Sequence, residues 1–248
     1  MNDVLIVTGG GRGIGAATAK LAAERGYAVC VNYRTNQAAA DAVVSAIRAA
    51  GGKALAVGAD VASEPDVVRL FATVDDQLGP LAALVNNAGI LEQQARVEQI
   101  DAARIDRVFA TNVRGAFLCA REAVRRLSTR HGGAGGSIVN VSSRAAQLGS
   151  PGEYVDYAAS KAALDALTIG LAREVAGEGI RVNGVRAGII YTDIHAAGGE
   201  PGRVDRLGPG LPMQRGGDAI EVARAIVWLL SDEASYSTAS FIDVAGGR

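Results

Sequence analysis

A tyrosine and a lysine four residues apart, in Tyr157-Ala-Ala-Ser-Lys161, have the spacing that best suits proton transfer in this sequence. Residues four apart lie next to each other on one face of a helix, so the phenol and the ammonium would be neighbours. A nearby cation favours the phenolate and would lower the pKa of a phenol, which is about 10 when free. The pair is therefore a candidate acid–base group. Tyr154 lacks such a partner, because Ala158 stands four residues after it.

A glycine-rich segment upstream, Thr8-Gly-Gly-Gly-Arg-Gly-Ile-Gly15, joins a short apolar strand to an alanine-rich helix. Such a turn points backbone N–H groups and a helix N-terminus at a phosphate group. Gly9 would permit the tight turn, Gly13 the approach of backbone to phosphate, and Gly15 the packing of helix on strand. The segment predicts a nucleotide site, with a purely structural turn as the alternative.

The end of the second strand, Val31-Asn-Tyr-Arg-Thr-Asn36, bears on which nucleotide is held. An NAD site usually carries Asp or Glu there, bound to the ribose 2′-hydroxyl. This sequence has Asn32, Tyr33 and Arg34 instead, and Arg12 in the glycine turn could point the same way. Two guanidinium groups suit a 2′-phosphate and favour NADP(H), whereas two solvated surface arginines are the alternative interpretation.

Two further strand ends suit a dinucleotide. Leu84-Val-Asn-Asn-Ala-Gly89 offers amides and small residues where a chain could pass close to an adenine ring and a ribose. Asp60 and Val61 close the third strand and could flank the adenine. An ordinary Asn-rich turn is the alternative for the first of these segments.

Composition and charge exclude several classes of protein. The 248 residues are 49% hydrophobic, with 32 glycines and a formal net charge of −1, which fits a globular α/β enzyme and gives no basic field for nucleic acid. No apolar run approaches the roughly 20 residues of a membrane span, and no Cys/His cluster predicts a metal site. Cys30 and Cys119 lie in apolar runs and predict buried thiols, and MNDVLIVTGG shows no signal peptide, so we expect a cytoplasmic protein.

Alternating β and α patterns predict one α/β domain over residues 1–248, a Rossmann-type doubly wound parallel sheet of about seven strands with helices on both faces. The stretch 188–217 is rich in Gly and Pro and is expected to be an irregular substrate lid, with an exposed insertion as the alternative. The expected strands are Val4–Thr8, Ala28–Asn32, Ala54–Gly58, Ala83–Asn86, Ser137–Ser142, Ile180–Val185 and Ser240–Val244. The expected helices are Ile14–Arg25, Gln37–Ala50, Pro65–Leu78, Ala102–Leu127, Tyr157–Ala176 and Ala219–Leu230.

The motifs together resemble the short-chain dehydrogenase/reductase family over essentially the whole chain. They are, in order, TGGGRGIG, Asp60, NNAG, Asn112, the serines of Val139-Asn-Val-Ser-Ser143, YAASK and Asp243-Val-Ala-Gly-Gly247. Within the family the chain is similar to the bacterial glucose-1-dehydrogenase-like and 3-oxoacyl-carrier-protein-reductase-like branch. The resemblance implies an oxidoreductase that interconverts a carbonyl and a secondary alcohol by hydride transfer. It also implies NADP(H) or NAD(H) as cofactor and a homotetramer.

The resemblance also implies roles for individual residues. Tyr157 would be the general acid in carbonyl reduction, Lys161 would lower its pKa and hold the nicotinamide ribose, Ser143 would hydrogen-bond the substrate oxygen, and Asn112 would hold a water behind Lys161. The cofactor-binding residues would be Gly9, Arg12, Gly13, Ile14, Gly15, Asn32, Tyr33, Arg34, Asp60, Val61, Asn87, Ala88, Gly89, Tyr157, Lys161, Gly188, Ile190 and Thr192.

The chain departs from the family pattern at Ala187, where a proline is usual before Gly188, and at Ala239, where a glycine is usual. The substrate pocket is expected to suit a polar or medium-sized carbonyl compound. The alternatives are an NAD-preferring sugar dehydrogenase and a dinucleotide-binding regulator without turnover. The residues expected to line the pocket are Leu91–Gln94, Arg144–Leu148, Tyr154, His195, Arg203 and Arg206.

Overall fold

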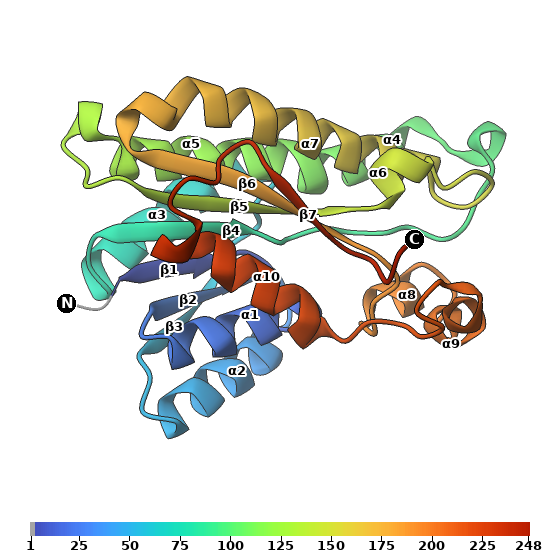
Figure 1. Cartoon of the computed structure of the whole chain (residues 1–248), viewed down its shortest axis with the longest axis horizontal. Coiled ribbons are helices and arrows are strands. Elements are labelled where there is room, and N and C mark those ends of the chain that lie inside the picture. Colours follow the sequence, from blue (N-terminus) through green and yellow to red (C-terminus); the bar gives the residue numbers. More distant parts are fainter. Residues whose placement is uncertain (1–2) are drawn as a thin grey trace.

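Seven parallel strands form one sheet in a computed structural model that describes residues 3–248 (Figure 1). Their order across the sheet is β3-β2-β1-β4-β5-β6-β7. The fold is the predicted doubly wound Rossmann-type domain, and each strand differs from its predicted bounds by two residues or fewer at either end. The strands are β1 (Val4–Val7), β2 (Ala28–Tyr33), β3 (Ala54–Gly58), β4 (Leu81–Asn86), β5 (Gly136–Ser143), β6 (Ile180–Ala187) and β7 (Phe241–Val244).

Helices cover both faces of this sheet. On one face lie α1 (Gly13–Glu24), α2 (Gln37–Ala49) and α10 (Ala219–Leu230), and on the other lie α3 (Glu64–Gln77), α5 (Gly115–Leu127) and α7 (Val155–Val175) (Figure 1). Shorter helices are α4 (Ala102–Phe109), α6 (Ala145–Leu148), α8 (Ile194–Ala197) and α9 (Arg203–Leu207). None of the helices in residues 3–248 combines the length and the apolar character needed to cross a membrane.

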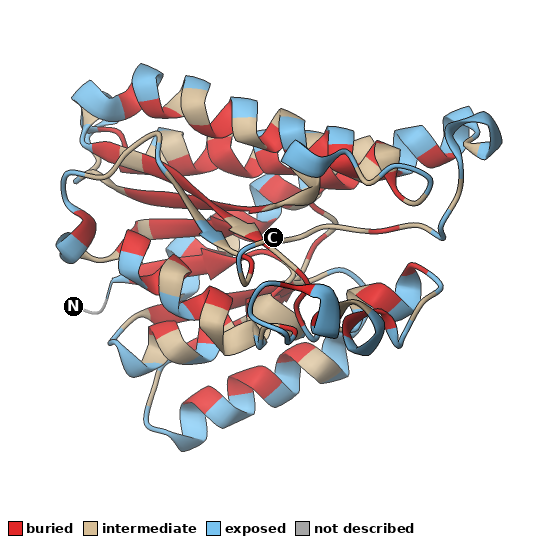
Figure 2. Cartoon of the chain, turned by 45° about the vertical axis from the view of Figure 1, so that its right-hand side comes forward, coloured by how far each residue is buried: buried red, intermediate tan, exposed pale blue. Residues whose placement is uncertain are grey.

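Two hydrophobic cores separate the sheet from its two helix layers. Alternate residues of β1 show the division, because Leu5 and Val7 pack towards α1, α2 and α10, whereas Ile6 packs towards α3, α5 and α7. The central strands are buried on both faces, as Figure 2 shows, which explains why they are apolar throughout. Cys30 and Cys119 are buried, unpaired thiols in one of these cores, as predicted.

The strand order reverses between β1 and β4, because the chain runs outward to β3 and then returns to the other side of β1. Loops that leave the carboxyl ends of β1 and β4 therefore diverge and open a crevice at that edge of the sheet. The glycine turn follows β1, and Asn87 to Gly89 follow β4. The topology thus brings both predicted nucleotide segments to one place.

Two predicted elements contain internal structure that was not predicted, although the helix Ala102–Leu127 has the expected bounds. The expected single helix Ala102–Leu127 is α4, a π-helical segment over Ala110–Arg114, and α5. The stretch 188–217 is not wholly irregular, because it contains α8, α9 and a 3-10 turn over Gly208–Gly210. These helices span only four and five residues, so they present too few turns for a periodic pattern to be detected.

Candidate active site

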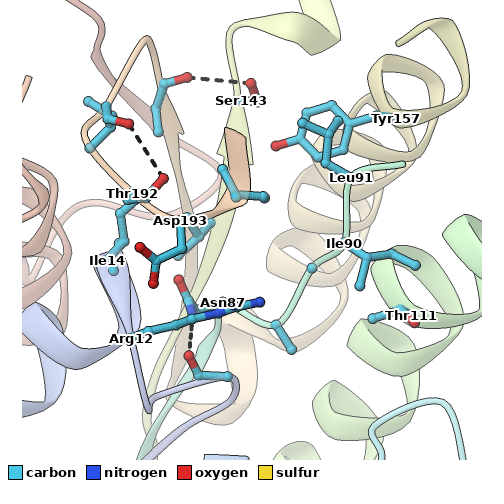
Figure 3. Close-up of a pocket in the computed structure, with 18 of the residues that line it drawn as sticks. Arg12, Ile14, Asn87, Ile90, Leu91, Thr111, Ser143, Tyr157, Thr192 and Asp193 are labelled. Carbon is cyan, nitrogen blue, oxygen red and sulfur yellow. Dashed lines mark hydrogen bonds between the residues drawn. The ribbon is translucent and has the colours of Figure 1, made fainter. Parts of the chain in front are cut away.

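A cavity of about 480 Å³ lies at the carboxyl ends of the strands and gathers nearly all of the predicted site residues (Figure 3). Seventeen of the eighteen predicted cofactor-binding residues line it, together with Ser143. The predicted site residues that do not are Gly15, which is buried in the glycine turn, and the catalytic candidate Asn112, which lies close to Gly89 and Lys161.

The glycine turn has the backbone shape that its sequence predicted. Gly9 and Gly13 have φ values of 61° and 51°, in the left-handed region that other residues rarely adopt. A Cβ on Gly15 would collide with the carbonyl oxygen of Gly9, so this glycine serves packing. Arg12 is the N-cap of α1, and its side chain makes no capping hydrogen bond within residues 3–248, while Gly13 and Ile14 of the first turn line the cavity. The turn can therefore hold a phosphate group.

Thr8 links the two nucleotide segments, a function that the sequence reasoning missed. Its hydroxyl accepts hydrogen bonds from the N–H groups of Asn87 and Ala88, each at 3.0 Å, and donates to the carbonyl of Val85 at 3.2 Å. The Asn87 side chain also joins the two segments, because its amide donates to the carbonyls of Thr8 and Gly9 at 2.9 and 3.0 Å. In the sequence, the threonine that directly precedes the glycines was the feature from which this link could have been inferred.

Asn32 lies where an NAD site usually has an acid, but its side chain serves the fold. The amide is 2% exposed, accepts from the Gly9 N–H at 3.2 Å and donates to the carbonyls of Val57 and Ala59. Arg12 and Arg34 are exposed at the same end of the cavity, and neither forms an ion pair within residues 3–248. This end therefore offers uncommitted positive charge and no carboxylate after β2.

Tyr157 and Lys161 lie one turn apart on α7 and face the cavity, but their electrostatics differ from the prediction. The Lys161 ammonium donates to the carbonyl of Val141 at 2.8 Å and lies 5.6 Å from the centre of the Tyr157 ring. Burial raises the pKa of Tyr157 to about 12, while a hydrogen bond with Ser143 opposes the rise. Burial also lowers the pKa of Lys161 to about 8, with Asp165 opposing. The expected net lowering of the phenol pKa is therefore wrong for this arrangement, because loss of hydration disfavours both charges and is the largest effect on Tyr157.

The two adjacent serines at the end of β5 face different partners. Ser142 is buried and donates to the backbone carbonyl of Lys161 at 3.3 Å. Ser143 lies by Tyr157 in the cavity, where its hydroxyl contacts the Ala187 carbonyl at 3.4 Å and accepts from the Ala145 N–H at 3.1 Å (Figure 3). Ser143 is thus the serine beside the phenol, as the sequence reasoning chose.

Asn112 occupies the π-helical segment between α4 and α5, where the extra residue per turn widens the helix. Its side chain is 1% exposed and makes hydrogen bonds to both the N–H and the carbonyl of Ile90 and to the Ser160 hydroxyl. The amide fixes the chain after Gly89 to α7 beside Lys161.

The departures from the family pattern have different consequences. Ala187 continues β6, paired in register with Ser143 on one side and Val244 on the other. Gly188 then passes so close to Ala245 that a Cβ would clash with it. Ala239, by contrast, has a φ of 55°, in the region that favours the glycine usual there.

The segment 188–217 closes one side of the cavity through His195 and Arg203, which are 8% and 5% exposed. His195 contacts the Ile190 carbonyl through Nε2 at 3.0 Å, and its Nδ1 has no hydrogen-bond partner among residues 3–248. Because a carbonyl only accepts, Nε2 carries the proton in the neutral ring. Arg206 was predicted to line the pocket but lies outside it, exposed and paired with Glu200.

Residues predicted to form the substrate pocket are only partly gathered there. Leu91, Ala145, Leu148 and Tyr154 line the cavity with Arg144, and the Tyr154 hydroxyl donates to the Gly198 carbonyl at 3.1 Å. Besides Arg206, the members of the predicted set that lie outside it are Glu92, Gln93, Gln94, Ala146 and Gln147. Asp193, which was not predicted, joins the lining beside Thr192 (Figure 3). The described side chains contain no group of three His, Cys, Asp or Glu suited to a metal.

Comparison with known proteins agrees with this geometry. Residues 9–248 match the family described as "Enoyl-(Acyl carrier protein) reductase". The chain is 62% identical over 245 residues to an uncharacterized oxidoreductase, YgfF, of Escherichia coli, covering 99% of each chain. It is 36% identical over 247 residues to 3-oxoacyl-[acyl-carrier-protein] reductase FabG of Staphylococcus epidermidis, covering 100% of this chain and 99% of that protein. A short chain dehydrogenase from Burkholderia cenocepacia, solved in complex with NADP, is 34% identical with a TM-score of 0.89, covering 99% of this chain and 97% of that one.

The chain belongs to the short-chain dehydrogenase/reductase family. It is an oxidoreductase of the class that interconverts CH–OH and C=O groups with a nicotinamide dinucleotide. The alternative of a regulator without turnover is therefore set aside.

Proposed function

We propose that this enzyme is an NADP(H)-dependent reductase of carbonyl compounds, in which Tyr157 is the general acid. The observation that carries the proposal is that Ser143, Tyr157 and Lys161 face the same cavity as the glycine turn and the two uncommitted arginines. One end can hold a phosphorylated nucleotide, and the other can hold an oxygen atom that gains a proton.

The residues of the cavity fit the cofactor. The open N-terminus of α1 would receive the diphosphate, Arg12 and Arg34 the 2′-phosphate, and Asp60, Val61 and Asn87 to Gly89 the adenine side. Gly188, Ile190 and Thr192 would lie along the nicotinamide. When bound, the nicotinamide ring supplies or accepts the hydride.

Side chains of the protein would carry out the proton transfer and stabilise the charges that develop. With a pKa of about 12, the Tyr157 phenol is protonated at neutral pH and suited to donate its proton to a carbonyl oxygen. Ser143, which lies beside that phenol, would hold the same oxygen as negative charge develops on it. Lys161 would hold the ribose and stabilise the phenolate left after transfer. Asn112 would hold a water in a proton relay behind Lys161.

Other parts of the proposal concern the surroundings of the site. We place the 188–217 segment as the substrate lid, because His195 and Arg203 reach the cavity from it. NADP(H) is preferred over NAD(H) because of Arg12 and Arg34, in keeping with the NADP complex of the Burkholderia cenocepacia relative. We also propose a homotetramer with two-fold axes in the cytoplasm, a state that light scattering would test.

The proposed chemistry is tested by Tyr157→Phe, with NADPH oxidation measured against a panel of ketones and aldehydes. Removing the proton donor should abolish turnover while NADPH binding, followed by calorimetry, stays within about twofold, because the phosphate contacts remain. Lys161→Ala should lower turnover and also weaken NADPH binding. A Tyr157→Phe enzyme with near-normal kcat would exclude the phenol as the acid. Glucose oxidation with NAD, run on the same enzyme, tests the sugar dehydrogenase alternative.

A further inference from the structure

Three arginines from different parts of the chain line the same cavity as Tyr157. Arg144 follows β5, Arg203 lies on α9, and Arg248 follows β7. Arg144 is paired with Asp243 at 2.6 Å. Arg203 is paired with Glu153 at 2.5 Å and with Glu200 at 2.9 Å. These two guanidinium groups are therefore neutralised by carboxylates of the protein.

Arg248 differs from the other two, because its guanidinium makes no hydrogen bond and no ion pair within residues 3–248. It is nonetheless only partly exposed, and it lines the cavity. Partial burial lowers its pKa, and the nearby charge of Arg203 lowers it further, against a smaller opposing effect of Glu153. A partly dehydrated cation without a counter-ion is costly unless an anion joins it.

The backbone fixes Arg248 in this position. Gly246 and Gly247 have φ values of 60° and 87°, which turn the chain after β7. The Gly246 carbonyl accepts from the N–H of Met213 in the 188–217 segment at 3.1 Å. The Arg248 backbone oxygen accepts from Arg144 Nε at 2.8 Å, and its N–H donates to the Ala245 carbonyl at 3.2 Å. Little ordering of the main chain would thus be needed when a ligand binds.

We propose that Arg248 binds an anionic group, a carboxylate or a phosphate, that the carbonyl substrate carries at the end remote from the reacting oxygen. This inference rests on the proposed reductase function and specifies its substrate class. A guanidinium fork matches both anions, since each presents two oxygens to paired N–H donors. The lid cation Arg203 is already paired with two glutamates, so Arg248 is the member of the three that can accept a substrate anion.

The test compares each anionic substrate with its neutral counterpart, using NADPH oxidation. Pyruvate, acetoacetate and levulinate vary the distance from carbonyl to carboxylate and are paired with their methyl esters. Dihydroxyacetone phosphate is paired with dihydroxyacetone. We expect kcat/KM to favour at least one anion over its partner by about tenfold to a hundredfold, the range of a charge-assisted contact. The pair that shows the preference identifies carboxylate or phosphate as the anion.

Arg248→Gln should remove this preference while reduction of the neutral partner stays within about twofold, and Arg248→Lys should retain part of it. Arg224→Gln removes an equal charge from the exposed face of α10 and should change neither rate. Calorimetry with malonamate, an unreactive analogue of acetoacetate, gives a readout without turnover and should show weaker binding to Arg248→Gln when the carboxylate pair is preferred.

The assignment of Arg248 would be overturned if every anion and its neutral partner had equal kcat/KM. It would also be overturned if Arg248→Gln lowered kcat/KM equally for the anionic and the neutral substrate. Neutral ketones would still be reduced in that event, so the proposed reductase function would survive. Failure to reduce any carbonyl compound, neutral or anionic, would instead count against the reductase proposal itself.

Discussion

Cofactor preference can be reversed at the end of β2 by Tyr33→Asp combined with Arg34→Ala. Tyr33 packs over Gly58 at the edge of the cavity, and Arg34 beside it is exposed and unpaired within residues 3–248. A carboxylate at position 33 would accept from a free ribose 2′-hydroxyl and repel a 2′-phosphate, while loss of Arg34 removes an attractive charge. The variant should therefore prefer NADH.

The size of the effect follows from the exposure of the two guanidinium groups. A hydrogen bond to a charged group contributes about 1.5–3 kcal/mol, and exposure to water and salt favours the lower end for Arg12 and Arg34. One such contact is worth about a tenfold preference for NADPH. Asn32 adds nothing to either preference, because its amide is committed to Gly9, Val57 and Ala59.

The assay is kcat/KM for NADPH and NADH with one carbonyl substrate at a single ionic strength. Arg25→Ala is the matched control, because Arg25 is exposed at the end of α1, outside the cavity, and its loss should leave the ratio unchanged. The preference should also weaken as salt rises, since surface charges are screened. The reasoning from Arg12 and Arg34 would be refuted by a clear preference for NADH in the unmodified enzyme. It would also be refuted if the ratio of kcat/KM for NADPH to that for NADH did not change with salt concentration.

Two predictions concern the stability of the site. The pKa of buried His195 is lowered below 6.5, so the folded state binds fewer protons than the unfolded chain and stability should fall as the pH drops below about 6.5. Urea unfolding above and below that pH should show that acidification lowers the free energy of unfolding less in His195→Gln than in the unmodified protein. His131→Gln, a change at the surface, should lose as much as the unmodified protein. The same pH dependence in all three proteins would contradict this prediction. Ala239→Gly should raise the free energy of unfolding by about 0.5–1 kcal/mol by relieving the positive φ, whereas Ala225→Gly inside α10 should lower it by about 1 kcal/mol, and a destabilised Ala239→Gly protein would be the contrary result.

Local patterns were enough to predict most of the fold and the main members of the site. The positions of the strands could be predicted because a sheet covered on both faces requires continuous hydrophobic runs, as in β1 and β2. The glycine turn and the Tyr157–Lys161 pair were readable because backbone geometry and helix periodicity each impose a fixed spacing. The strand order was not predicted, since nothing local records which strands become neighbours.

Features that depend on contacts across the fold were missed or misjudged. Asn32 was predicted from its place after the glycine turn, but the hydrogen bonds of its amide with Gly9, Val57 and Ala59 come from other strands and loops and leave no local pattern. Thr8 joins two loops that lie about eighty residues apart in sequence, which no local pattern can reveal. The π-helical segment at Asn112 and the short helices α8 and α9 likewise leave no periodic signal.

The phenol pKa gives the most informative difference between sequence and structure. Spacing alone suggested that Lys161 would bring Tyr157 towards a neutral pKa, but burial raises the phenol pKa to about 12 and lowers that of Lys161 to about 8. The buried site thus favours a neutral phenol with its proton in place, which is the form needed to reduce a carbonyl. Oxidation of an alcohol needs the phenolate and should therefore require higher pH than reduction does. The raised phenol pKa therefore predicts separate pH profiles for the two directions, with reduction retained near neutral pH and oxidation rising only as the phenolate forms, and pH profiles of kcat that coincide would contradict this.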